Sequence, residues 1–270
     1  MPKDTAQSNQ DSSLVARRSS LGLEEARALV ASPLWPRIRA FLWNFASLCD
    51  PARLTAAFEA PSSNGEEQTE EAGDPLVTRH SSLVTAEGLL GSPRTARAAE
   101  QALGLVPFFH SFPATDASRL LLLSREGYDR LAQFLGVVAL APALRRVTAG
   151  ADVRALKAAL PGVYPATLAF TAYFRRHEPL FERLVPAGEA ANPAVVCSAG
   201  HRLLAAALSD LPPELLLRQR LRFPEGSPAD AALAREAGSV PEASASGAAL
   251  AAAKLALKLS NPTEYSTLCS

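Results

Sequence analysis

Apolar positions recur at helical spacing through the middle of the chain, most densely over residues 120–160. One stripe advances in steps of three, four and three residues and consists of Tyr128, Leu131, Leu135 and Val138. Such steps keep side chains on one face of an α-helix, and the polar residues between them fall on other faces. The pattern therefore predicts a helix over about residues 125–140.

Two shorter helices are expected to follow. Pro142 suits the first turn of one, because its missing amide N–H would have had no intrahelical partner, and Gly150 is placed to end that helix in the left-handed conformation. Asp152 is a potential N-cap for the next helix, which Pro161 and Gly162 would stop. The apolar residues that would share a face of that helix are Val153, Leu156 and Leu160. Three helices on short turns predict a packed helical body.

Helical spacing extends to both sides of this region. Between residues 163 and 185, Pro179 is expected to kink or divide the helix. The further predicted helices cover residues 24–31, 38–45, 51–60, 93–104, 163–185, 193–209 and 248–259.

Two segments near the C-terminus depart from the helical pattern. In residues 217–223, Arg218, Arg220 and Arg222 alternate with apolar or amide side chains, which is typical of a strand. Residues 225–247 are rich in Gly, Ser, Ala and Glu and are expected to form a linker.

Two other segments lack the apolar content of a packed element. Residues 1–22 are polar and Ser-rich and are expected to be disordered, and residues 61–75 carry five acidic residues without a basic one and are expected to form an acidic loop.

The predicted fold class is mainly α. A single compact multi-helix domain spans residues 23–224 with at most a short strand near residues 217–223, and a linker and C-terminal helix span residues 225–270.

The composition limits the classes of binding partner and the cellular compartment that can be expected for the protein. Lys plus Arg and Asp plus Glu both number 27, so the formal net charge is zero and no global field attracts nucleic acid or an anionic membrane. No apolar run approaches the ~20 residues of a membrane-spanning helix, and the N-terminus lacks the apolar region of a secretory signal. Three widely spaced cysteines fit reduced thiols. A cytoplasmic protein without direct membrane insertion is expected.

The chain lacks the familiar motifs of catalysis. It contains no glycine-rich phosphate loop, no nucleophile elbow and no His-Glu-x-x-His sequence, so we predict no enzyme activity and no cofactor. The alternative is an uncharacterised thiol or zinc enzyme, because Cys197 and His201 lie four apart on a predicted helix. Cys49, His80 or His110 would have to supply further ligands, and a small thiol on a helix more often belongs to the core.

Basic residues gather after residue 144. The basic positions include Arg145, Arg146, Arg154, Lys157, Arg175 and Arg176. They could form a solvated face or a patch that meets an acidic partner. No aromatic interleaving accompanies them, so nucleic acid is not expected.

The central sequence LAQFLGVVALAPALRRVTAGADVRALKAALPG resembles the central region of the SctK/YscK family, the K-type accessory proteins of the bacterial type III secretion sorting platform. Residues 43–45 and 49–54 are similar to the family's N-terminal Asn-containing segment, which ends in a His-Pro-Ser-Arg-Leu element. Residues 201–208 and the sequence LRQRLRFP resemble its closing helix and Arg-Leu-Arg-Leu-Pro element. The matches occur in the family's order and together span residues 43–224.

The N-terminal element departs from the family's pattern at two positions. Asp50 stands where the family often has His, and Ala52 stands where it often has Ser. Pro51, Arg53 and Leu54 are the positions that match.

The resemblance implies a non-enzymatic cytosolic adaptor at the cytoplasmic face of the secretion apparatus. Such a protein links the cytoplasmic domain of the SctD-type inner-membrane ring protein to a pod built from SctQ, SctL and the ATPase. The candidate protein-interaction residues are Arg53, Arg145, Arg146, Arg154 and Lys157. The polar N-terminus also fits an unstructured export signal, so the alternative function is that of a secreted type III effector or translocator.

Overall fold

The computed structural model describes residues 30–59, 93–105, 112–113, 115–185, 192–237 and 243–269. Every regular element in these ranges is a helix, which confirms the mainly α, multi-helix fold class. The expected disordered segment 1–22 and the acidic loop 61–75 lie outside the described residues, as does the predicted helix 24–31 apart from its last two positions, which are helical. No helix within the described ranges is long and apolar enough to cross a bilayer.

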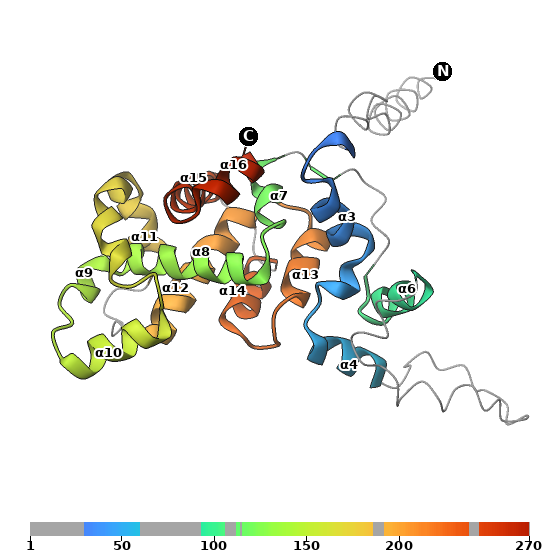
Figure 1. Cartoon of the computed structure of the whole chain (residues 1–270), viewed down its shortest axis with the longest axis horizontal. Helices are drawn as coiled ribbons and strands as arrows, with labels where there is room; N and C mark the ends of the chain where they lie inside the picture. The colour runs from blue at the N-terminus through green and yellow to red at the C-terminus, as the bar shows by residue number, and fades with distance from the viewer. Residues whose placement is uncertain are drawn as a thin grey trace, which may run out of the picture.

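Helix α8 (Arg125–Ala139) is the central element, and it runs across the middle of the molecule in Figure 1. Its start is capped by Ser124, whose Oγ accepts the Gly127 N–H at 3.0 Å. The predicted stripe is buried over its whole length, and comprises Tyr128, Leu131, Leu135 and Val138. The periodicity of the sequence thus identified the helix and its core face.

Helix α12 (Pro193–Leu208) crosses α8 at very short range. A Cβ added to Gly136 of α8 would lie closer than 3.0 Å to the backbone oxygen of Val196, and a Cβ added to Gly200 of α12 would lie as close to that of Ala132. The two glycines therefore allow backbone-to-backbone contact between the helices. Helices α14 (Pro228–Ala237) and α15 (Ala243–Ser260) pack against α12.

One end of the molecule holds α9 (Ala141–Leu144), α10 (Gly150–Ala159), the 3-10 helix η3 (Ala166–His177) and α11 (Glu178–Leu184). Pro142 and Pro179 lie in the first turns of α9 and α11, so Pro179 divides the predicted 163–185 helix as expected. Gly150 does not end α9; it begins α10, and its φ is not positive. The N-cap of α10 is Ala149, so Asp152 lies within the first turn instead of capping it.

The other end holds α3 (Trp35–Trp43), η1 (Phe45–Ser47), α4 (Pro51–Glu59) and α6 (Pro93–Ala102), as Figure 1 shows. The short α7 (Asp116–Leu120) leads into α8, and α16 (Pro262–Cys269) follows α15. Arg37 of α3 pairs with Glu264 of α16, and Lys254 of α15 pairs with Asp116 of α7. The C-terminal helices therefore tie into the N-terminal part of the body.

Two predictions near the C-terminus are wrong. Residues 217–223 form no strand, because Pro213–Leu221 is a helix, α13. The alternation misleads because Arg218 and Arg222 are buried beside the leucines, instead of facing solvent. Residues 225–247 are not a simple linker, because they contain α14, whose Ala229, Ala232 and Leu233 are buried. An Ala-rich segment can form a buried helix here because α14 packs directly on α12 and α13, where short side chains fill the contact.

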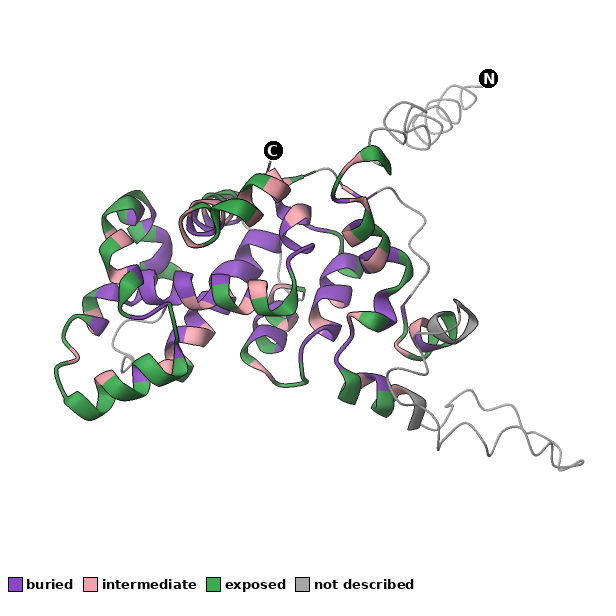
Figure 2. Ribbon diagram, viewed as in Figure 1, coloured by how far each residue is buried: buried purple, intermediate pink, exposed green. Residues whose placement is uncertain are grey.

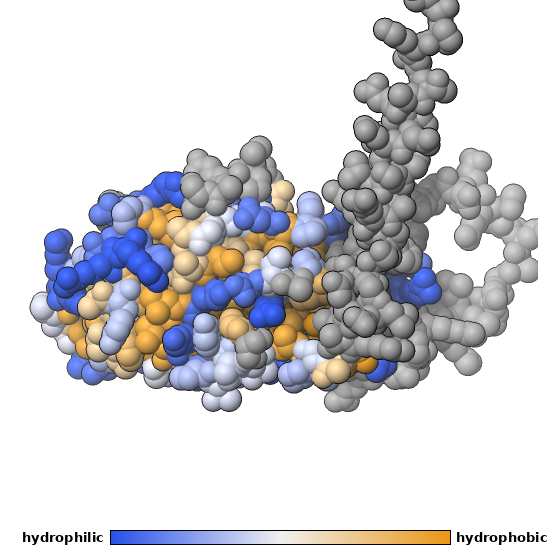
Figure 3. All heavy atoms as spheres, turned by 90° about the horizontal axis from the view of Figure 1, so that it is seen from above, coloured by the Kyte–Doolittle hydropathy of each residue, from blue (hydrophilic) through white to orange (hydrophobic). Residues whose placement is uncertain are grey.

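Burial follows this arrangement. Figure 2 shows buried residues concentrated on the central helices, whereas α10 is largely exposed and buries only Leu156 among its ten residues. Seen from above in Figure 3, hydrophobic residues reach the surface between hydrophilic ones, so this face is a mosaic of the two kinds.

Candidate functional site

The segment after η1 bonds directly to the end of α13. The backbone N–H of Asp50 donates to the Leu221 carbonyl at 2.9 Å, and the thiol of Cys49 donates to the same oxygen at 3.1 Å. Arg53 Nε donates to the Phe223 carbonyl at 2.8 Å. Residues 49–53 therefore satisfy backbone acceptors that the end of α13 leaves free. Burial raises the pKa of the Cys49 thiol to about 12, so this group stays protonated.

A buried carboxylate completes this contact. Asp230 of α14 lies 2.6 Å from Arg53 Nη2, and it accepts hydrogen bonds from Arg220 Nε and from the Gly226 N–H, both at 3.0 Å. Burial alone would raise the pKa of Asp230, but the two hydrogen bonds and the charge of Arg53 outweigh it and leave that pKa below its ordinary value. The carboxylate is therefore held ionised by groups of its own chain.

Helix α8 reaches the same place. Arg125 Nη1 donates to Asp50 Oδ2 at 3.1 Å, and its guanidinium lies 5.9 Å from the centre of the Phe223 ring. The rings of Tyr128 and Phe223 lie 5.3 Å apart. We call this meeting point of residues 49–53, 221–230 and the start of α8 the junction.

Arg222 extends the junction into the core. Its guanidinium donates to the carbonyls of Leu121 at 2.8 Å and Leu123 at 2.6 Å, which follow the end of α7, and to Gln219 Oε1 at 2.9 Å. Burial lowers the pKa of Arg222 to about 10, which still leaves it charged at neutral pH. The fork geometry of arginine lets one side chain satisfy two carbonyls that the end of a helix leaves free.

The polar groups of the junction thus bind one another and the backbone. Arg53, a predicted interaction residue, has a side chain only 13% exposed and is bonded to Phe223 and Asp230. Because its partners belong to the same chain, we interpret Arg53 as a residue that stabilises the fold, and we do not propose it as a contact to a partner protein. Sequence reasoning missed Asp230 because it lies in the segment that reads as a linker.

The other four predicted interaction residues are exposed. Arg145 and Arg146 follow α9, and Arg154 and Lys157 lie on α10. Arg145 is held by Thr171, whose Oγ1 accepts its Nη2 at 2.5 Å. Two of the four charges therefore follow α9 and two lie on α10. Arg145 reaches Thr171 of η3, whereas the α10 pair stands on either side of buried Leu156 in the sequence.

The Cys197 and His201 pair is integrated into the core. Nδ1 of His201 lies 2.8 Å from the carbonyl oxygen of Cys197, and its Nε2 lies 3.0 Å from Oδ1 of Asp129. Burial, followed by the charge of Asp129, raises the pKa of the Cys197 thiol, which disfavours a thiolate nucleophile. Cys49 is at the junction, and His80 and His110 lie outside the described residues. Within those residues, no three His, Cys, Asp or Glu side chains gather as metal ligands would.

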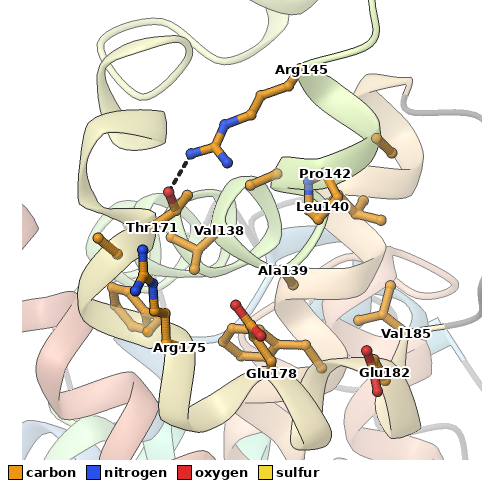
Figure 4. Close-up of a pocket in the computed structure, with 15 residues that line it drawn as sticks. Val138, Ala139, Leu140, Pro142, Arg145, Thr171, Arg175, Glu178, Glu182 and Val185 are labelled. Atoms are coloured by element: carbon orange, nitrogen blue, oxygen red, sulfur yellow. Dashed lines mark hydrogen bonds between the residues drawn. The ribbon is translucent and has the colours of Figure 1, made fainter.

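A pocket of about 500 Å³ opens between the end of α8 with α9 and the pair η3 and α11. Arg145 and Arg175 approach Thr171 from two sides, while Glu178 and Glu182 follow one another along α11 (Figure 4). Sequence reasoning missed this pocket, because its walls come from elements joined by turns. Arg145 and Arg175 stood out in the sequence as basic positions, but nothing in the local pattern relates them to Glu178 and Glu182.

No protein-family model, no curated protein and no solved structure matches this chain.

Proposed function

We propose that this chain is a non-enzymatic adaptor of a bacterial type III secretion sorting platform, located at the cytoplasmic face of the apparatus. The observation that supports it best is the junction, where two segments that resemble the SctK/YscK family, residues 49–54 and the sequence LRQRLRFP, bond to each other beside the start of α8, the helix that leads into the central match. Residues 49–53 bond to the backbone at Leu221 and Phe223, and α8 adds Arg125 and Tyr128. Segments in mutual contact constrain one another, so the resemblance of both segments together is more specific than two isolated short matches.

The partners in this proposal are protein surfaces. The adaptor binds the SctQ-type pod protein and the cytoplasmic domain of the SctD-type ring protein, and it reaches SctL and the ATPase indirectly. It requires no cofactor, nucleic acid or membrane insertion. The exposed basic residues contribute to one of these interfaces: Arg145, Arg146, Arg154 and Lys157.

Co-purification from the native host, followed by mass spectrometry, tests the proposal. We expect SctQ, SctL and the ring protein to be recovered with the tagged chain. Recovery of a dedicated chaperone alone, together with secretion of the chain that is lost when residues 1–20 are deleted, would establish the effector reading instead.

Charge reversal tests the basic face within the same assay. Replacing Arg145, Arg146, Arg154 and Lys157 with Glu is expected to reduce recovery of at least one partner tenfold or more. A matched control reverses four exposed arginines on other helices: Arg39, Arg97, Arg130 and Arg235. Equal recovery of both partners by the two variants would remove the basic face from the proposal.

A further inference from the structure

The pocket between α8–α9 and η3–α11 has an apolar interior. Phe174, Phe181 and Val185 line one wall, and Val138 and Leu140 line the other. All five side chains are buried in the body of the protein, so the walls are held by core packing. A rigid apolar hollow of this kind accepts an inserted side chain without rearranging.

The rim of the pocket carries positive charges at one end and negative charges along α11. Arg145 and Arg175 lie at the end near Thr171, whereas Glu178 and Glu182 lie on successive turns of α11 (Figure 4). All four side chains are exposed, and none of them forms an ion pair with any residue in the described part of the chain. The pocket therefore has a positive end and a negative end whose charges are not neutralised locally.

This arrangement matches the anatomy of a protein-docking site. Binding surfaces of proteins typically combine a central apolar pocket, which takes one anchor side chain, with a charged rim that sets orientation. A segment with charges of opposite order would meet attraction at both ends, and the reversed orientation would meet repulsion at both.

We propose that this pocket binds a short amphipathic segment of a partner protein. Its anchor is a large apolar side chain such as Leu, Met or Phe, seated between Phe174 and Val138. An Asp or Glu on one side of the anchor pairs with Arg145 and Arg175, and a Lys or Arg on the other side pairs with Glu178 and Glu182. This inference rests on the adaptor role and names the place where one platform partner docks.

Site-specific photo-crosslinking in the host cell tests the docking directly. A benzophenone amino acid replaces Ala172, an exposed residue of the pocket wall, in the full chain. The control carries it at Ala231, an exposed residue of α14. We expect the Ala172 probe, and not the Ala231 probe, to crosslink to a partner peptide in which an apolar residue separates an acidic from a basic one.

A charge swap tests the orientation. Arg175→Glu is expected to reduce the crosslink at least tenfold, and replacing the acidic residue of the crosslinked peptide with Lys is expected to restore it. Arg130→Glu, an exposed substitution on α8, serves as the control. No crosslink from Ala172, a crosslink to this chain itself, or loss without restoration would overturn the inference.

Failure of the two proposals can be told apart. If platform proteins co-purify with wild type and with the Arg175→Glu variant alike, the pocket inference fails while the adaptor role stands. If the crosslinked and charge-swapped peptide belongs to a protein outside the platform and no platform protein co-purifies with wild type, the pocket is a docking site and the adaptor role fails.

Discussion

Gly200 lies so close to the carbonyl oxygen of Ala132 that no side chain fits between α12 and α8 at this point. Gly200→Ala forces the helices apart and is expected to lower the free energy of unfolding by about 3 kcal/mol. Urea unfolding followed by circular dichroism measures it. Gly247→Ala is the control, because a Cβ on this exposed residue of α15 meets nothing within 4 Å. It should raise stability by about 0.5 to 1 kcal/mol, and equal losses in both variants would contradict the close crossing.

Asp230→Asn is expected to destabilise the protein by about 2 to 3 kcal/mol at neutral pH, because Arg53 and Arg220 lose their buried counter-charge. The pKa of Asp230 is lowered in the fold, so its contribution is present above the ordinary value of 3.8 and is lost as pH falls through the lower folded value. Wild type and variant should therefore converge in stability in strong acid. Asp152→Asn, exposed on α10, should change stability little, and a constant gap between wild type and Asp230→Asn down to pH 2 would refute the assignment.

Arg222→Met removes the donor to the carbonyls of Leu121 and Leu123 and is expected to cost about 3 kcal/mol of unfolding free energy. Arg222→Lys should recover little of this loss, since an ammonium group lacks the planar fork that reaches both oxygens. Arg146→Met, at an exposed site, should fall within about 0.5 kcal/mol of wild type. Full recovery by lysine would show that only the charge matters.

His177 is expected to make the protein less stable as pH falls from 7 to 5. Burial, followed by the charge of Arg176, lowers the pKa of His177 below its ordinary value of 6.5. Below 6.5 the unfolded chain binds a proton that the folded chain does not, so acidification favours unfolding. His177→Phe keeps a ring beside Phe174 and Phe181 and should reduce this pH slope in urea titrations at pH 7, 6 and 5. An unchanged slope would locate the dependence elsewhere.

Local patterns in the sequence were sufficient for elements that bury one apolar face. The stripe that begins at Tyr128 predicted α8, Pro142 predicted the first turn of α9, and Pro179 predicted the division that separates η3 from α11. The same reasoning failed at α13, because it assumes that arginine faces water. Arg218 and Arg222 are buried and bonded within the fold, so the positions of the arginines in the sequence do not show which face of α13 is exposed to solvent.

The site was less accessible from the sequence. Four of the five predicted interaction residues are exposed, but the fifth, Arg53, bonds to Phe223, which lies 170 positions further along the chain. No local pattern reports such a pairing. The sequence singled out Arg145 and Arg175 of the pocket as basic positions but not the pocket itself, because its shape depends on how η3 and α11 fold back over α8.

The contact between Arg37 and Glu264 sets an order of events during synthesis. These residues are 227 positions apart, so at roughly 5 to 20 residues per second the ribosome needs on the order of 10 to 50 s to pass from one to the other. For most of that interval α3 and α4 exist without α13 and α14, and until its end they exist without α16. The N-terminal part of the body can therefore finish folding only after Glu264 has been made, and until then part of its apolar surface is available to chaperones.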